Sequence, residues 1–198
     1  MGTAEGVQRF LDDLRIKCRE NNIKIKFRRG KRVKIEDGIY GGGYFYYIDR
    51  EIVVARKNIH WLAILVHESC HLDQYLENTE IWQKSDKWGH QLDNWLSGKK
   101  VKNLRKAVNS TIALELDCEK RSIKKIAYYD LPINTITYIQ KANAYILYYK
   151  YVGQVRRWKP KPYDNPEIYL KMPSRFMSDS YYRKLPDKIK KIFIEQNL

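Results

Sequence analysis

Four long stretches of the chain repeat apolar residues every three or four positions, which is the period of a helix with one buried face. We expect helices at residues 3–21, 59–76, 103–128 and 134–154. Thr3 is a suitable N-cap for the first of them, and Asn21-Asn22 can end it. Pro132 lies just before the last helix and Gly153 lies near its end, as is usual at helix boundaries.

Between the first two helices, apolar and polar residues alternate, which is typical of half-buried strands. Such runs lie at residues 23–27 and 32–35, each with basic side chains on the outer face. Two more runs, at residues 44–48 and 51–55, predict a hairpin that turns at Asp49-Arg50. The glycine-rich stretch 38–43 lacks the lysine, the hydroxyl residue and the following helix of a phosphate-binding loop, so it indicates a bend or bulge in the sheet.

These elements predict an α+β fold, with a small antiparallel or mixed sheet followed by a helix that carries the candidate chemistry and by further packing helices. A chain of 198 residues can build one domain with its own core. We expect that domain at residues 1–150 and a basic extension rich in proline and aromatic residues, packed on it, at residues 151–198. Spaced tryptophans predict an irregular, anchored segment at residues 77–98, and a short last helix is expected at residues 187–196.

The helix predicted at residues 59–76 contains the pattern HExxH, formed by His67, Glu68 and His71. Residues four apart lie on one helix face, so both imidazoles can bind one Zn²⁺. Glu68 lies about 100° round the helix, where its carboxylate can take a proton from a water that the metal acidifies. The pattern predicts a zinc site with Glu68 as general base. The alternative is a buried helix with two hydrogen-bonded histidines, and it is weaker because burying these polar groups is costly.

A catalytic zinc site uses a third protein ligand. The extended pattern HExxHxxGxxH is excluded, because Gln74 and Glu77 stand where it needs Gly and His. A later predicted helix offers Glu115 and Glu119, which are four apart and share a face. One of them can bind the metal while the other accepts a hydrogen bond from a ligating histidine. Asp117 points to the other side of that helix and is less favoured.

The pairing of HExxH with a later Glu-x-x-small-acid pattern resembles the gluzincin-type zincin metallopeptidases, including compact minimal domains of bacteria and their phages. The resemblance covers roughly residues 38–125. It assigns the zinc-ligand position to Glu115, the small position to Cys118 and the acidic position to Glu119, where the family has Asp or Asn. It implies a zincin-like fold and a hydrolase of the endopeptidase kind. It also implies a protein or peptide substrate that pairs as an extended strand with a sheet edge beside the metal.

A donor near the metal would stabilise the oxyanion that forms during peptide hydrolysis, and Tyr or His commonly provides it. The sequence does not select this donor. Tyr128, Tyr129 and Tyr145 are the first candidates, and His90 is expected to be exposed or structural.

The net charge is +15, from 38 basic and 23 acidic residues. A positive field attracts nucleic acid, an acidic substrate or an anionic surface. The tail at residues 150–198 has twelve basic residues against five acidic ones, and residues 158–163 interleave aromatic side chains with lysines. Such a strip can bind single-stranded nucleic acid, but a loop wrapped on the domain is favoured. A basic nucleic-acid- or partner-binding module with a structural zinc site is therefore the alternative to a peptidase.

The cysteines, Cys18, Cys70 and Cys118, are odd in number and show no framework spacing, which favours reduced thiols in a cytoplasm, the host's if the chain is viral. Cys70 and Cys118 flank proposed ligands. A small buried side chain is the favoured role for each, and a thiolate ligand is the alternative. No apolar run reaches the roughly 20 residues that span a bilayer, and no secretory leader pattern is present, so we expect an intracellular protein without membrane contact.

Overall fold

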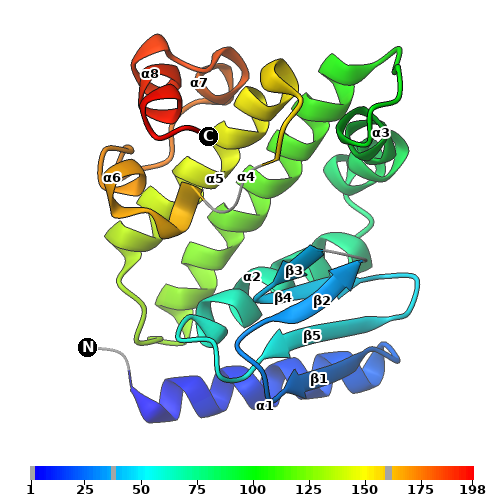
Figure 1. The fold of residues 1–198 in the computed structure, drawn as a ribbon. Coiled ribbons are helices and arrows are strands. Elements are labelled where there is room, and N and C mark those ends of the chain that lie inside the picture. Colours follow the sequence, from blue (N-terminus) through cyan, green and yellow to red (C-terminus); the bar gives the residue numbers. More distant parts are fainter. Residues whose placement is uncertain (1–2, 37–38, 159–161) are drawn as a thin grey trace. The chain divides into compact units, whose positions relative to one another are not determined.

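The structure is a computed structural model that describes residues 3–36, 39–158 and 162–198 (Figure 1). Residues 159–161 of the aromatic and basic strip, and Gly38 of the glycine-rich stretch, lie outside the described residues. The described part contains eight α-helices, a mixed sheet of three strands and a second sheet of two strands, so the α+β class is confirmed. None of its helices is both long enough and apolar enough to cross a membrane.

The helices and strands follow the chain in an order close to the predicted one. The strands are β1 (Lys24–Arg28), β2 (Val33–Glu36), β3 (Ile39–Gly41), β4 (Gly43–Tyr46) and β5 (Glu51–Ala55). The helices are α1 (Ala4–Glu20), α2 (Trp61–Leu76), α3 (Glu80–Leu96), α4 (Leu104–Tyr128), α5 (Thr135–Val155), α6 (Pro166–Tyr169), α7 (Asp179–Lys184) and α8 (Asp187–Glu195), with a short 3₁₀ turn, η1, at Pro162–Asp164.

The chain divides into two compact units. The first contains residues 1–77 and 121–133, and the second contains residues 78–120 and 134–198. Helix α4 contributes residues to both units. Helix α5 continues past residue 150, where the sequence suggested that an extension begins.

The first unit is built on a sheet with the strand order β1-β5-β4. The central strand β5 pairs in parallel with β1 and antiparallel with β4, and all five of its residues are buried. The hairpin of β4 and β5 is confirmed, and Arg50 in its turn adopts a left-handed conformation with φ 53°. Strand β2 pairs with β3 in the separate two-stranded sheet.

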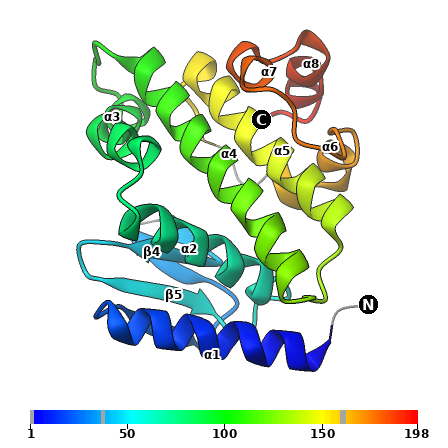
Figure 2. The same ribbon diagram turned by 180° about the vertical axis from the view of Figure 1, so that it is seen from behind.

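Two helices of the first unit hold this sheet. Helix α1 begins at the predicted cap, where Thr3 Oγ1 accepts a hydrogen bond from Gly6 N at 2.9 Å. Its buried side chains, Phe10, Leu11, Leu14 and Cys18, follow the predicted stripe. Helix α2 packs on β4 and β5, which Figure 2 shows from behind.

The side chain of Ile64 on α2 packs directly against the glycines at the start of β4. A Cβ atom on Gly43 would lie only 2.7 Å from both Ile64 Cγ2 and Val53 O, and one on Gly42 would also clash with Ile64. Gly41 ends β3 and Gly43 begins β4, so the glycine-rich stretch links two strands. Any residue larger than glycine at position 43 would push helix and strand apart.

An ionic and hydrogen-bonded network ties α2 to α1 and to the last turns of α4. Asp73 on α2 pairs with Lys17 of α1 and with Lys125 of α4, each at 2.7 Å. Lys125 also donates to Ser69 Oγ at 2.8 Å. Burial raises the pKa of Asp73, but the two lysines outweigh it and hold that pKa below its usual value. Three helices of the first unit are thus joined around one carboxylate.

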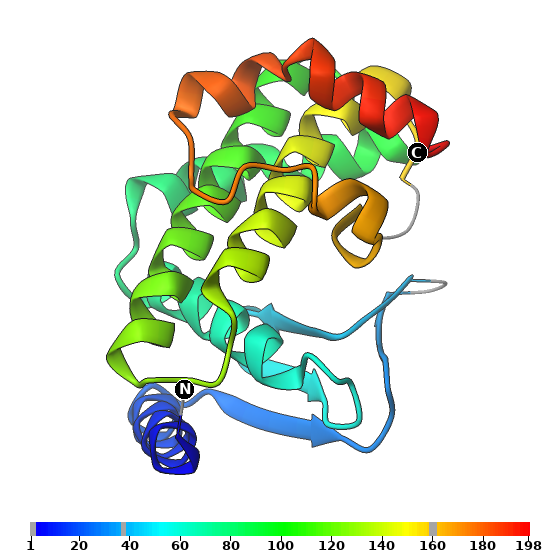
Figure 3. The same ribbon diagram turned by 90° about the vertical axis from the view of Figure 1, so that its left-hand side faces the viewer.

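The second unit has a helical core to which the C-terminal segments contribute. Tyr182, Phe193 and Ile168 are fully buried in the same cluster as Leu147 and Tyr148 of α5. Helices α6, α7 and α8, orange and red in Figure 3, all contact α5. Tyr182 and Asn143 are hydrogen-bonded in this core at 2.5 Å. The predicted last helix is confirmed as α8.

The prediction of an irregular segment at residues 77–98 is wrong, because most of it forms helix α3. Thr79 caps this helix by accepting a hydrogen bond from Trp82 N at 3.1 Å. Trp88 and Trp95 pack against the core of the second unit, and Leu92 is buried in it. Their spacing of three to four residues is helical, but the polar residues between them and Gly89 obscured it.

Glu51 provides a test of the sheet of the first unit. Its carboxylate is bound by Lys26 of β1 and accepts a hydrogen bond from Tyr44 of β4 at 3.0 Å. The hydrogen bond from Lys26 lowers the pKa of Glu51, burial opposes this, and Tyr44 lowers the pKa further. Since Lys26 is partly exposed, we expect Glu51→Gln to destabilise the protein by about 1–2 kcal/mol at pH 7, measured by urea unfolding.

The sign of the pH dependence follows from the lowered pKa. The contribution of Glu51 is fully present above the unfolded-state pKa of about 4.3 and is lost as the pH falls through the lower folded-state value. The difference between wild type and variant should therefore narrow below about pH 4. Asp12→Asn, which breaks an exposed pair with Arg15, is the control and should change stability by less than about 0.5 kcal/mol. Equal effects of the two substitutions would contradict this role of Glu51.

Candidate metal centre

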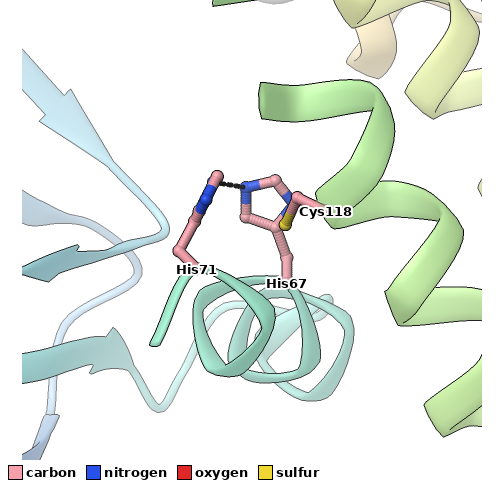
Figure 4. A group of neighbouring side chains, drawn as sticks. All are labelled: His67, His71 and Cys118. Carbon is pink, nitrogen blue, oxygen red and sulfur yellow. Dashed lines mark hydrogen bonds between the residues drawn. The ribbon is translucent and has the colours of Figure 1, made fainter. Parts of the chain in front are cut away.

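His67 and His71 lie on one face of α2, as their spacing predicts. Their Nε2 atoms are 3.1 Å apart, and the two ring planes are nearly perpendicular at 88° (Figure 4). Two nitrogen ligands of a tetrahedral zinc ion, each about 2.0–2.1 Å from the ion, are separated by about 3.3 Å. The histidine pair therefore has the spacing that one ion requires.

Gln74 determines which nitrogen of His71 can bind a metal. His71 Nδ1 lies 2.8 Å from Gln74 Oε1, and an amide oxygen only accepts hydrogen bonds. Assigned from this contact, Nδ1 carries the hydrogen and Nε2 keeps its lone pair, the form that a metal binds. Gln74 is fully buried, so it holds the ring in place. This role was not predicted from the sequence, although a residue three positions after a ligand lies on the same helix face.

Glu68 is the residue after His67 and is buried, with 8% of its surface exposed. Burial keeps its carboxylate away from bulk water, and its role as general base stays a prediction.

Helix α4 brings a cysteine to the histidines. Its last part packs on α2, where Ser122 Oγ lies 3.5 Å from Cys70 Sγ. Cys118 is one turn before Ser122 on this continuous helix. The sulfur of Cys118 and ring nitrogens of His67 and His71 all lie within 4.8 Å of one another (Figure 4), so these residues could bind a metal ion.

The chemistry of this donor set suits zinc. Zn²⁺ binds imidazole nitrogen and thiolate sulfur, and catalytic sites combine three such protein ligands with an open position. Cys118 is fully buried, so its sulfur is not otherwise a surface nucleophile. From the sequence, a small buried side chain was the favoured role for Cys118 and a thiolate ligand was the alternative.

Glu115 and Glu119 are both buried on α4, at 7% and 6% exposure, and neither belongs to the group that contains the histidines. Glu115 lies close to a pair of tyrosines of α5. Burial, and then the charge of Glu115, raise the pKa values of Tyr145 and Tyr149 well above the usual value. The hydroxyl oxygens of these tyrosines are 2.6 Å apart. Asp117, the less favoured ligand, is half-buried.

The predicted oxyanion donors occupy different environments. Tyr128 is 71% exposed. Tyr129 donates a hydrogen bond to Asp13 at 2.9 Å, and burial followed by this contact raises its pKa to about 12. The hydroxyl of Tyr145 is engaged with Tyr149, and His90 is exposed on α3. The raised pKa values of Tyr129 and Tyr145 mean that both hydroxyls keep their protons at neutral pH and can donate hydrogen bonds.

Replacing Gln74 should weaken metal binding without removing a ligand. We expect Gln74→Leu, which preserves volume, to lower the affinity for zinc by about 10–100-fold, because the ring of His71 loses the partner that orients it. Competition against a coloured chelator would measure this. Gln74→Glu keeps an acceptor and should lose less, and Gln8→Leu, at an exposed position on α1, is the control. Unchanged affinity in Gln74→Leu would contradict the orienting role.

Comparison with known proteins found no match: no protein-family model, no curated protein and no solved structure is significantly similar to this chain. The functional interpretation therefore rests on the residues of the chain and on their geometry.

Proposed function

We propose that this protein is a zinc-dependent metallopeptidase in which Glu68 is the general base. One observation carries the proposal. The Nε2 atoms of His67 and His71 converge to 3.1 Å, while buried Gln74 holds the opposite nitrogen of His71. Two imidazole nitrogens at this separation can supply two of the four ligands of a tetrahedral zinc ion, and Glu68 is the residue after His67 in the sequence.

The position of Glu68 supports a catalytic site over a purely structural one. Structural zinc sites are closed by four protein ligands and need no base. Here the group contains two imidazoles and one thiol, which leaves a position for a small molecule. A buried carboxylate on the residue after a ligand can serve as the base for a water bound at that position.

The residues of the chain then have defined tasks. Bound zinc would supply a Lewis acid that brings the pKa of water from about 16 towards about 7. The carboxylate of Glu68 accepts the proton of the attacking water and passes it to the nitrogen of the leaving amine. Gln74 keeps His71 in the tautomer that binds metal. His67 and His71 are ligands, and the contact geometry supports Cys118 as the third, whereas the gluzincin resemblance supports Glu115 with Glu119 as its partner.

The sheet suggests how a peptide substrate would bind. Strands β1 and β4 are the outer strands of the three-stranded sheet, and β4 is the one that packs on α2. An extended peptide can add to such an edge through main-chain hydrogen bonds. We therefore propose β4 as the substrate-binding edge.

Metal analysis of protein purified without chelator tests the ligand set. We expect about one zinc per chain in the wild type and its loss in His67→Ala, because that change removes a ligand. Cys118→Ser should also lose zinc, whereas Glu115→Gln should retain it if its carboxylate is not bound to the metal. If Cys118→Ser retained zinc and Glu115→Gln lost it, Glu115 and not Cys118 would be the third ligand. Zinc-free wild type would overturn the metal site.

Activity of Glu68→Gln tests the general base. This variant should bind zinc as the wild type does but hydrolyse casein about 10²–10⁴-fold more slowly, since proton transfer is lost. Glu80→Gln changes an exposed carboxylate on α3 and is the matched control. If zinc-loaded wild type cleaves nothing, or if Glu68→Gln cleaves as fast, the peptidase proposal fails while the metal site stands.

A further inference from the structure

Two loops of the first unit join at one end of its sheet and contain no acidic residue. They are residues 29–32, which connect β1 to β2, and residues 56–60, which connect β5 to α2. Backbone hydrogen bonds connect them, from Arg56 N to Arg28 O, at the end of β1, at 2.7 Å and from Lys57 N to Gly30 O at 3.2 Å. The two loops therefore form one continuous surface.

Five basic side chains define this surface, which we call the basic loop surface: Arg29, Lys31, Arg32, Arg56 and Lys57. All five are exposed. None of them takes part in an ion pair with a carboxylate of the described residues. Their charges are therefore uncompensated locally, and they concentrate part of the net charge of +15 in a small region.

Arg56 is held in a defined orientation. Its guanidinium carbon lies 4.3 Å from the ring centre of Trp61 and 5.3 Å from that of Phe27. Stacking on the rings leaves the N–H groups, which lie in the guanidinium plane, available to a planar or tetrahedral anion. The adjoining first turn of α2 has no acidic residue, so the positive end of its dipole adds to the field.

We infer that the basic loop surface binds nucleic acid through the sugar-phosphate backbone, without reading the bases. Phosphates spaced along a strand match several separated cations better than a single anion does. Ile59 is the one exposed apolar side chain in the two loops, at 88%, which is too little apolar area to enter a membrane. The rings of Phe27 and Trp61 are half-buried and face Arg56, so they offer no platform for stacking bases.

The salt dependence of binding tests this inference. Fluorescence anisotropy of a labelled 20-base-pair duplex of arbitrary sequence should show affinity that falls steeply with KCl. The double variant Lys31→Gln/Arg32→Gln should reduce the slope of log K against log salt by about 2 and weaken binding at 100 mM salt by about tenfold or more. A second duplex of unrelated sequence should behave in the same way.

A matched control distinguishes the effect of this surface on binding from the effect of the net charge. Lys184→Gln/Lys188→Gln removes two exposed charges from the second unit, so both double variants go from +15 to +13. The control should change the affinity by less than about threefold and keep the slope, because phosphates are not bound there. Thermal melting followed by circular dichroism will show that both double variants are folded.

Several outcomes would overturn the inference. They are no binding to the duplex at 50 mM KCl, an equal loss in the two double variants, or binding to vesicles containing phosphatidylserine but not to the duplex. The inference would also be overturned if the protein bound single-stranded DNA more strongly than the duplex and the Lys31→Gln/Arg32→Gln variant bound it as tightly as the wild type. The measurement involves no hydrolysis, so its failure leaves the proposed peptidase untouched, and failure of the peptidase test leaves this surface untouched.

Discussion

The structure of the first unit depends on the need to give partners to polar groups that α2 carries into the core. Ser69 and Gln74 are fully buried, and Asp73 is nearly so. Each would be costly without a hydrogen bond or an ion pair. Lys125 donates a hydrogen bond to Ser69 and pairs with one carboxylate oxygen of Asp73. Lys17 pairs with the other carboxylate oxygen of Asp73. The positions of α1 and of the end of α4 are therefore set by polar contacts as much as by apolar packing.

Features with a local cause could be predicted from the sequence. The boundaries of α2 and α4 follow from apolar periodicity, and the hairpin of β4 and β5 follows from alternation around Arg50. The approach of His67 to His71 also has a local origin, since a helix places residues four apart on one face. For the same reason, the candidate base could be named before its burial was known.

Features that depend on distant parts of the chain could not be predicted. The parallel pairing of β1 with β5 joins residues about 27 apart in sequence, such as Ile25 and Ile52, and no local pattern encodes it. Helix α3 was not predicted because its apolar residues are sparse. Packing of those residues against the core of the second unit compensates for a weak helix propensity. The choice between Cys118 and Glu115 depends on how α4 is rotated, because the two are three residues apart on similar faces of the helix.

The close approach of α2 to β4 has a consequence for redesign of this protein. Gly42 and Gly43 have no side chain, so Ile64 packs directly on the backbone of the strand. Ile64 lies three residues before His67 on the same helix. Helices in a close-packed interior shift as rigid rods when one contact is enlarged. Redesign of the candidate metal centre should therefore leave both glycines unchanged and vary the far side of the helix, because a single added methyl group at the strand would displace both imidazoles together.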